Sequence, residues 1–283
     1  MTPPETYAVR PGGGPPDSPG WLVRAVPNKY PVLSAGAEPE PPDPLEHGRG
    51  DPVLFASGPA QGAHEVIVHT PDHVTSLADL EPEQLDLVIE AWRARLSAHP
   101  EAAYRHLIVN EGLAAGASLE HTHAQLYGLP FVPALVARER ERFTAHNTRT
   151  MGGCLLCDLL QEEARRNERI VAVDEQAVLL APYASRMPYE LQLVPRRHAL
   201  SILEDDASPA NLLHDGLTRL ERTLGGLPPL NLWVRNAPAG AEHFHWRIDI
   251  VPRITHLAGL ELGAGVAVNV YPPEHAAQDL RNA

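Results

Sequence analysis

The chain has 283 residues, of which 43% are hydrophobic, enough to bury the core of one large domain or of two ordinary ones. Its formal net charge of −13 disfavours broad binding to nucleic acid or to an anionic membrane, because those partners attract basic surfaces. No apolar run approaches the ~20 residues of a membrane span, and the first residues lack the basic and apolar regions of a signal peptide. We therefore expect a cytoplasmic protein without a nucleic-acid or membrane partner.

The N-terminal half predicts a strand, a long helix and two further strands. Residues 64–73 alternate like a strand, and the runs 107–110 and 121–125 predict the later two. Pro82 is placed to start the helix. One face of that helix carries Leu85, Val88, Ile89, Trp92 and Leu96. Residues 35–62 are rich in Pro and Gly, which indicates an extra loop in this half.

The same order of elements returns in the C-terminal half. Residues 189–198 alternate like a strand, and 230–236 and 243–247 predict two later strands. Between them, Ser208 and Pro209 are typical of a helix start, and Gly225 can end that helix. Its apolar stripe consists of Leu213, Leu217, Leu220 and Leu224.

The spacing of matching histidines indicates an internal repeat. His198 stands 125 positions after His73, and His245 stands 122 positions after His123. Such near-constant offsets are typical of duplicated units. We predict an α+β fold of two units, residues 1–150 and 151–283, each an antiparallel sheet packed with a long helix.

Three polar side chains of the first unit predict a catalytic site. His121, His123 and Gln125 alternate along a predicted strand, so all three should face one side. Two isolated histidines would be read more simply as satisfied core or surface groups. Here they follow a glycine-containing loop, whose backbone N–H groups can approach phosphate oxygens. That loop contains Asn110, Gly116 and Ser118.

This set of residues indicates phosphoryl chemistry. A neutral imidazole can attack phosphorus and form a phosphoramidate, and phosphoryl transfer needs donors to the phosphoryl oxygens. We therefore assign His123 as the nucleophile and Gln125 as one such donor.

The motif resembles the signature of galactose-1-phosphate uridylyltransferases and the related sugar-nucleotide phosphorylases, within the histidine-triad superfamily. Residues 21–31 also resemble the N-terminal nucleotide-side strand of that family. The resemblance implies two tandem histidine-triad-like domains and dimers that share sites between subunits. It also implies that His123 attacks the α-phosphorus of UDP-glucose while Gln125 holds the phosphoryl group. The implied substrate contacts are Asn28, Asn110, Gly116, Ser118 and His121.

The implied reaction is a ping-pong nucleotidyl transfer from a nucleoside diphosphate sugar. With a sugar 1-phosphate as acceptor the enzyme is a UDP-glucose:hexose-1-phosphate uridylyltransferase, our first expectation. With inorganic phosphate it is an ADP- or UDP-sugar phosphorylase. The remaining alternatives are a non-catalytic, zinc-stabilised nucleotide-binding protein and a dinucleoside-polyphosphate hydrolase. Triad hydrolases carry a third histidine where Gln125 stands, which favours transfer over hydrolysis.

The second unit predicts a structural zinc site. Cys154 and Cys157 are the only cysteines, and their spacing suits tetrahedral zinc together with His198. The repeat alignment favours His243 as the fourth ligand, since it corresponds to His121, and His245 is the alternative on the same strand face. Two free thiols or a redox pair are the competing interpretations.

Two departures from the family pattern limit the assignment. Family members carry a Cys-x-x-Cys run before a Thr-Pro-Pro-Glu segment, whereas this sequence begins Met-Thr-Pro-Pro-Glu. His73 and His121 then lack thiolate partners, so we expect no metal in the first unit. A basic N-terminal segment that contacts hexose phosphate is missing as well. In the second unit Arg247 stands where the first has Gln125, so we expect that unit to be non-catalytic.

Overall fold

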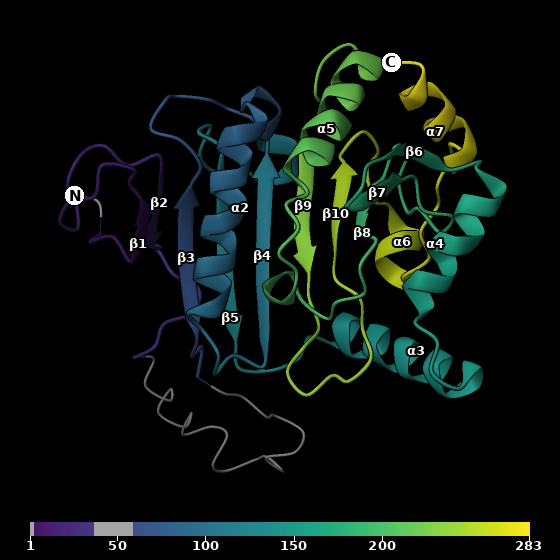
Figure 1. Ribbon diagram of the computed structural model, residues 1–283, viewed down its shortest axis with the longest axis horizontal. Coiled ribbons are helices and arrows are strands. Elements are labelled where there is room, and N and C mark those ends of the chain that lie inside the picture. The colour runs from purple at the N-terminus through teal and green to yellow at the C-terminus, as the bar shows by residue number, and fades with distance from the viewer. Residues whose placement is uncertain (1–2, 37–58) are drawn as a thin grey trace.

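The computed structural model describes residues 3–36 and 59–283, and within these ranges the strands form one continuous sheet (Figure 1). Its order is β1-β2-β3-β5-β4-β9-β10-β8-β7-β6, and every neighbouring pair runs antiparallel. The strands are β1 Tyr7–Val9, β2 Val23–Pro27, β3 Ala63–Val68, β4 Tyr104–Glu111, β5 His123–Leu129, β6 Ile170–Val173, β7 Ala177–Leu180, β8 Leu191–Pro195, β9 Leu230–Arg235 and β10 Arg247–Pro252.

The α-helices lie between and after these strands. They are α2 Pro82–Ser97, α3 Ala134–Thr150, α4 Leu155–Arg166, α5 Ala210–Leu224, α6 Gly259–Ala264 and α7 Pro273–Arg281, with short 3-10 turns η1 Leu77–Asp79, η2 Leu113–Ala115 and η3 Ile202–Glu204. No helix in the described part of the chain has the length and apolar character needed to cross a membrane.

The strand order reads as two matching halves. Strands β3, β5 and β4 on one side of the centre correspond to β8, β10 and β9 on the other. The halves are joined where β4 pairs with β9, with Leu107 opposite Val234. The antiparallel α+β fold is therefore confirmed, but the two sheets expected for the two units form one.

The predicted helices cover one face of this sheet and bury its main core. Helices α2 and α5 lie side by side across the centre (Figure 1). Pro82 is the first residue of α2, and Gly225 ends α5 with a left-handed φ of 71°. The apolar stripes predicted for both helices face the core. Leu224 is partly buried against it, and the other members are buried: Leu85, Val88, Ile89, Trp92, Leu96, Leu213, Leu217 and Leu220.

The helices α3 and α4 were not predicted, and they pack on the other face of the second half. There they form a smaller core, in which Phe143 and Phe244 stack with ring centroids 4.8 Å apart. On the same face of the first half, Gln125 and Tyr127 stay partly exposed. This difference between the halves leaves Gln125, one of the two predicted catalytic residues, accessible from that face.

Two strand boundaries differ from expectation. Strand β5 begins at His123 and β10 at Arg247, so His121, His243 and His245 precede the strands to which we assigned them. The Pro- and Gly-rich loop expected over 35–62 lies largely outside the described residues.

Candidate active site and metal centre

His123, the predicted nucleophile, is held by a hydrogen bond that fixes its tautomer. His123 begins β5, opposite Val68 of β3, and is 5% exposed. Its Nδ1 lies 2.8 Å from the carbonyl oxygen of His121. A carbonyl can only accept, so Nδ1 carries the proton and Nε2 keeps its lone pair. Burial lowers the pKa of His123, and the imidazole is neutral at pH 7.

His121 supports this arrangement from just outside the strand. Its Nε2 donates to the carbonyl oxygen of Thr70 across 2.9 Å, and its ring lies 5.7 Å from that of His73. Among residues 3–36 and 59–283, no group of three or more candidate metal ligands includes this histidine pair.

A buried polar chain, missed in the sequence, holds the residue between the two histidines. The Nε1–H of Trp92 donates to Nε2 of His69 across 3.3 Å, so His69 Nδ1 is the donor to Oγ1 of Thr122, 3.0 Å away. Thr122 then donates to Glu111 across 3.2 Å. Burial lowers the pKa of His69 and raises that of Glu111. The chain ties Thr122, and with it the backbone of the flanking residues His121 and His123, to the core.

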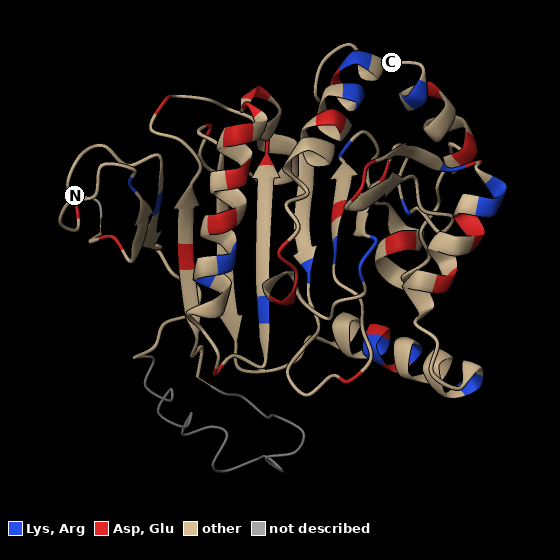
Figure 2. Cartoon of the chain, in the orientation of Figure 1, with Lys and Arg blue, Asp and Glu red and all other residues tan. Residues whose placement is uncertain are grey.

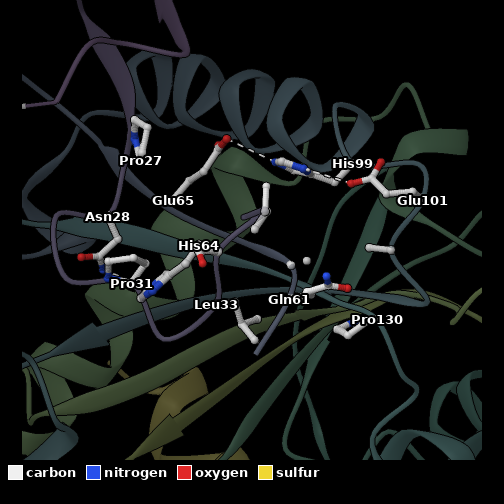
Figure 3. Close-up of a pocket in the computed structure, with 16 residues that line it drawn as sticks. Pro27, Asn28, Pro31, Leu33, Gln61, His64, Glu65, His99, Glu101 and Pro130 are labelled. Atoms are coloured by element: carbon white, nitrogen blue, oxygen red, sulfur yellow. Dashed lines mark hydrogen bonds and ion pairs between the residues drawn. The ribbon is translucent and has the colours of Figure 1, made fainter. Parts of the chain in front are cut away.

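Gln125 follows on the same side of β5 and contacts two further side chains. Its Oε1 accepts from the Tyr127 hydroxyl at 2.8 Å and lies 3.0 Å from Nε2 of His64. His64 and Asn28 line a pocket of about 530 Å³ at the far end of β5 (Figure 3). His123 does not line that pocket. His64 and Gln125 therefore lie between the pocket and the predicted nucleophile, His123.

The predicted glycine loop connects the end of β4 to the start of β5. Asn110 accepts a hydrogen bond at Oδ1 from Nδ2 of Asn231, across 2.8 Å. Asn231 belongs to the second half and also donates to the carbonyl oxygen of Ala115 at 2.8 Å. This bond orients the Asn110 amide so that its nitrogen is left for another partner. Ser118 lies exposed on the same loop.

Two glycines of the loop have backbone angles that favour glycine. Gly112 has a φ of 79° and Gly116 a φ of 86°. A Cβ on Gly112 would lie 2.9 Å from Cβ of Pro229, whereas one on Gly116 would meet nothing within 4 Å. Gly116 is thus required for its conformation and not for space.

Replacing Gly116 with Ala should lower the free energy of unfolding by about 1–2 kcal/mol, the cost of a left-handed backbone without glycine. We expect the rate of nucleotidyl transfer to fall by more than this loss of stability alone would cause, because the loop would relax away from this conformation. Urea unfolding and turnover with a nucleotide sugar measure the two effects. Gly12→Ala, at an uncrowded glycine without a positive φ, is the control. If Gly116→Ala and Gly12→Ala had the same unfolding free energy and the same turnover, the required conformation of Gly116 would be contradicted.

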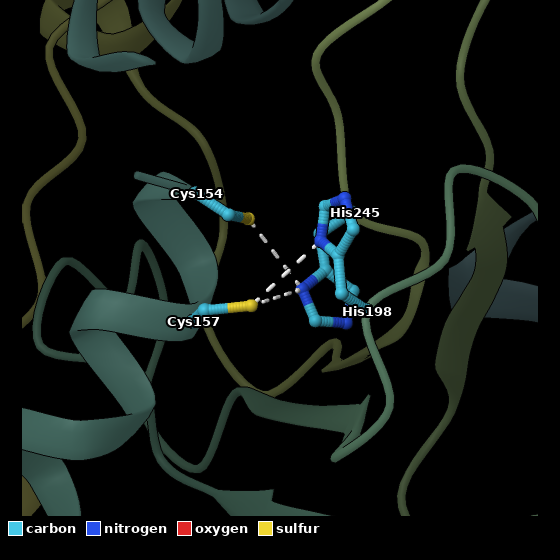
Figure 4. A group of neighbouring side chains, drawn as sticks. All are labelled: Cys154, Cys157, His198 and His245. Carbon is cyan, nitrogen blue, oxygen red and sulfur yellow. Dashed lines mark hydrogen bonds between the residues drawn. The ribbon is translucent and has the colours of Figure 1, made fainter. Parts of the chain in front are cut away.

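Four side chains of the second half gather into a group that can hold a metal ion (Figure 4). Cys154 caps the start of α4 and Cys157 lies in its first turn. Sγ of Cys157 lies 3.7 Å from Nδ1 of His198 and 3.4 Å from Nδ1 of His245, and Sγ of Cys154 lies 3.7 Å from the latter. All ligand atoms lie within 4.8 Å of one another.

The fourth member is His245, so the preference for His243 is corrected. Residues 243–246 precede β10 and do not alternate as a strand, and only the buried His245 meets the two thiols. Its Nε2 donates to the carbonyl oxygen of Pro195 across 3.1 Å, which leaves Nδ1 for a metal. Tetrahedral zinc with its usual bond lengths would separate sulfur and nitrogen ligands by ~3.5 Å, so the residues fit that ion.

The thiols also have the acid–base character of a ligand pair. A hydrogen bond with Cys157 and the neighbouring His245 lower the pKa of Cys154 to about 3. The pKa of Cys157 is raised, because it keeps the proton that the pair shares.

In the second half, the residues at the positions of the predicted catalytic pair, His123 and Gln125, have other partners. His245, at the position of His123, belongs to the metal group. Arg247, at the position of Gln125, donates to Glu139 at 2.6 Å and to Asp249 at 2.9 Å. Glu139 comes from helix α3, which carries both acidic and basic residues (Figure 2). Burial opposes ionisation of Asp249, but the Arg247 and Arg235 guanidiniums outweigh it and lower its pKa. These side chains form a compensated buried charge cluster.

Comparison with known proteins places these features in a family. Residues 23–133 match the family model of the galactose-1-phosphate uridyl transferase N-terminal domain. An ADP-glucose phosphorylase of Arabidopsis thaliana is 28% identical, over 98% of this chain and 78% of that protein. A galactose-1-phosphate uridylyltransferase of Streptomyces lividans is 31% identical, over 78% of this chain and 69% of that protein.

A solved structure supports the same relationship. The crystal structure of an ADP-glucose phosphorylase from Arabidopsis thaliana with bound ADP-glucose is 26% identical, with a TM-score of 0.83 over 99% of this chain and 86% of that chain. With the duplicated sheet and the His-x-His-x-Gln geometry, these matches show that the chain belongs to the galactose-1-phosphate uridylyltransferase family of enzymes.

Proposed function

We propose that this protein transfers a nucleotidyl group from a nucleoside diphosphate sugar to a phosphate-bearing acceptor, through a covalent nucleotidyl-His123. The observation that carries the proposal is the bond from Nδ1 of His123 to the His121 carbonyl oxygen. It presents a neutral Nε2 with a free lone pair beside Gln125.

The mechanism has two displacement steps. In the first, the lone pair of His123 Nε2 attacks the α-phosphorus, the bond from that phosphorus to the bridging oxygen breaks, and sugar 1-phosphate leaves. In the second, an oxygen of the acceptor phosphate attacks the same phosphorus and the P–N bond returns its electron pair to Nε2. Gln125, Asn110 and the backbone at Gly116 are suited to donate to the phosphoryl oxygens. Asn28 is proposed to contact the nucleotide from the pocket.

The acceptor separates two versions of the reaction. A sugar 1-phosphate acceptor makes the protein a UDP-glucose:hexose-1-phosphate uridylyltransferase, which agrees with the name of the Streptomyces relative. Inorganic phosphate makes it a sugar-nucleotide phosphorylase, which the ADP-glucose phosphorylase match favours. Incubation of UDP-glucose or ADP-glucose with each acceptor, followed by chromatography of the products, tests the proposal. Absence of product in all four reactions would overturn it.

We also propose that this group of four side chains binds zinc, with a structural role. When bound, zinc would be held by Cys154, Cys157, His198 and His245 in a closed four-ligand site, which leaves no position for substrate. Such a site links α4 to the segments that follow β8 and precede β10. It lies in the second half, away from His123.

Each half is proposed to be one histidine-triad-like domain, 1–150 and 151–283. The matching strand order supports this division, although α3 belongs to the first range and packs on the second half.

A homodimer is proposed as well, because exposed apolar side chains gather in one C-terminal segment. These side chains are Leu257, Leu260, Leu262, Val266, Val268 and Val270. Light scattering measures the mass of the protein in solution and so tests the dimer.

The rate at which the covalent intermediate forms should decrease only at acid pH. Protonation of Nε2 removes the nucleophile, and burial lowers the pKa of His123 below its ordinary 6.5. We expect the rate to be constant at alkaline pH and to fall in acid, with a midpoint below pH 6.5, as Nε2 binds a proton. Single-turnover kinetics as a function of pH measure it. A midpoint above pH 7 would contradict a depressed pKa.

A further inference from the structure

We infer that His64 and Tyr127 are positioning residues that fix the side-chain amide of Gln125, with its oxygen held by the protein and its nitrogen left for the phosphoryl group. This inference rests on the proposed function for its catalytic consequence and on the hydrogen bonds alone for its geometry. Neither residue was singled out in the sequence as part of the site.

The tautomer of His64 follows from its contacts. The backbone N–H of Val32 donates to Nδ1 of His64 across 3.2 Å, so Nδ1 carries the lone pair. Burial lowers the pKa of His64, and the neutral ring must then carry its proton on Nε2. That nitrogen lies 3.0 Å from Gln125, and it can only donate. The atom facing it must therefore be the amide oxygen of Gln125.

Tyr127 fills the second acceptor position of the same oxygen. Its hydroxyl donates to Oε1 of Gln125 across 2.8 Å. The Tyr127 ring stacks on His64 with centroids 4.3 Å apart and an interplanar angle of 23°. The sheet creates this contact, because His64 of β3 pairs directly with Tyr127 of β5. Each ring thus holds the other in place beside Gln125.

Asn28 also approaches Nε2 of His64. Its Oδ1 accepts from the backbone N–H of Tyr30 at 2.8 Å, which places its Nδ2 3.0 Å from that nitrogen. In the His64 tautomer set by Val32 this contact brings two donors together, and an acceptor on a ligand would satisfy the Asn28 amide hydrogens.

The consequence is a fixed donor beside the nucleophile. Rotating the Gln125 amide by a half turn would point its N–H₂ at the His64 donor, which is unfavourable. No acceptor in the described part of the chain binds the Gln125 amide nitrogen. Its two hydrogens are therefore available to the phosphoryl oxygens. A flipped amide would instead present its carbonyl oxygen, which would repel the phosphoryl oxygens.

A double-mutant cycle tests the inference. Tyr127→Phe removes only the hydroxyl and should slow formation of the labelled nucleotidyl-enzyme about three- to tenfold, the range expected for one hydrogen bond. In the Gln125→Ala background the same change should have no further effect, because no amide remains to be positioned. Tyr183→Phe, at a residue 74% exposed, is the matched control and should react like wild type. An equal loss in both backgrounds, or no loss in either, would overturn the inference.

A second measurement does not depend on turnover. In ¹⁵N-labelled protein the side-chain NH₂ resonances of Gln125 are identified by their absence from the Gln125→Ala spectrum. We expect Tyr127→Phe to shift or broaden them, and Tyr183→Phe to leave them unchanged. Unchanged Gln125 resonances in Tyr127→Phe would refute the positioning role. If wild type forms no adduct, the proposed function fails while this spectrum still decides the geometry.

Discussion

Replacing His123 with Ala should abolish nucleotidyl transfer, with kcat reduced by ~10⁴-fold or more, as expected when a covalent nucleophile is removed. The loss should be the same with UDP-glucose and ADP-glucose, since the first step is common to both. The substitution should shift the unfolding midpoint less than the removal of a core side chain would. His275→Ala on α7, where the side chain is exposed, should keep full activity. Turnover of His123→Ala within tenfold of wild type would exclude the covalent mechanism.

Removal of the metal should have the largest effect on stability. If zinc binds only the folded chain and its free concentration is a thousand times its Kd, it stabilises the fold by about 4 kcal/mol. A chelator should therefore lower the urea midpoint, and zinc should restore it. The wild-type protein should contain one zinc per chain by elemental analysis.

Substitution of a ligand separates metal loss from other effects of the chelator. Cys154→Ala should unfold at a lower urea concentration than wild type, and its midpoint should no longer respond to chelator or to zinc. His243→Ala should bind zinc normally, because His243 lies outside the group of four. A wild-type midpoint that ignores chelator, in protein that contains no metal, would contradict the zinc assignment.

The elements with strong periodicity could be predicted from the sequence. The stripe from Leu85 to Leu96 defined α2, and Gly225 marked the end of α5 because its left-handed angle favours glycine. The histidine spacings revealed the duplication, since both copies keep the same order of strands and helix. The common face of His123 and Gln125 on β5 followed from local spacing, because residues two apart on a strand share a face.

What the sequence could not show depends on contacts between distant residues. Joining of the halves into one sheet requires β4 to meet β9, and no local pattern encodes that pairing. The choice of His245 over His243 depended on where the chain enters β10. His64 gave no signal, because its role arises from pairing with Tyr127 across two strands.

The helices α3 and α4 were missed because they bury few apolar side chains. Of the apolar residues of α4, only Leu156 is buried. Helix α3 is rich in charged residues and buries only Val136 and Phe143, so its apolar stripe is weak. The polar chain from Trp92 to Glu111 is likewise visible only when the fold brings its members together. Buried polar networks of this kind lack a sequence period.

The most direct test of the account is to trap the intermediate. Wild-type protein is mixed with UDP-glucose or ADP-glucose labelled at the α-phosphorus, quenched, and compared with His123→Ala. We expect an acid-labile, base-stable labelled adduct in wild type alone, which is lost when galactose 1-phosphate or inorganic phosphate is added, and the effective acceptor then identifies the reaction. Folded, metal-loaded protein that forms no adduct with either nucleotide sugar would contradict the covalent mechanism and favour a nucleotide-binding role.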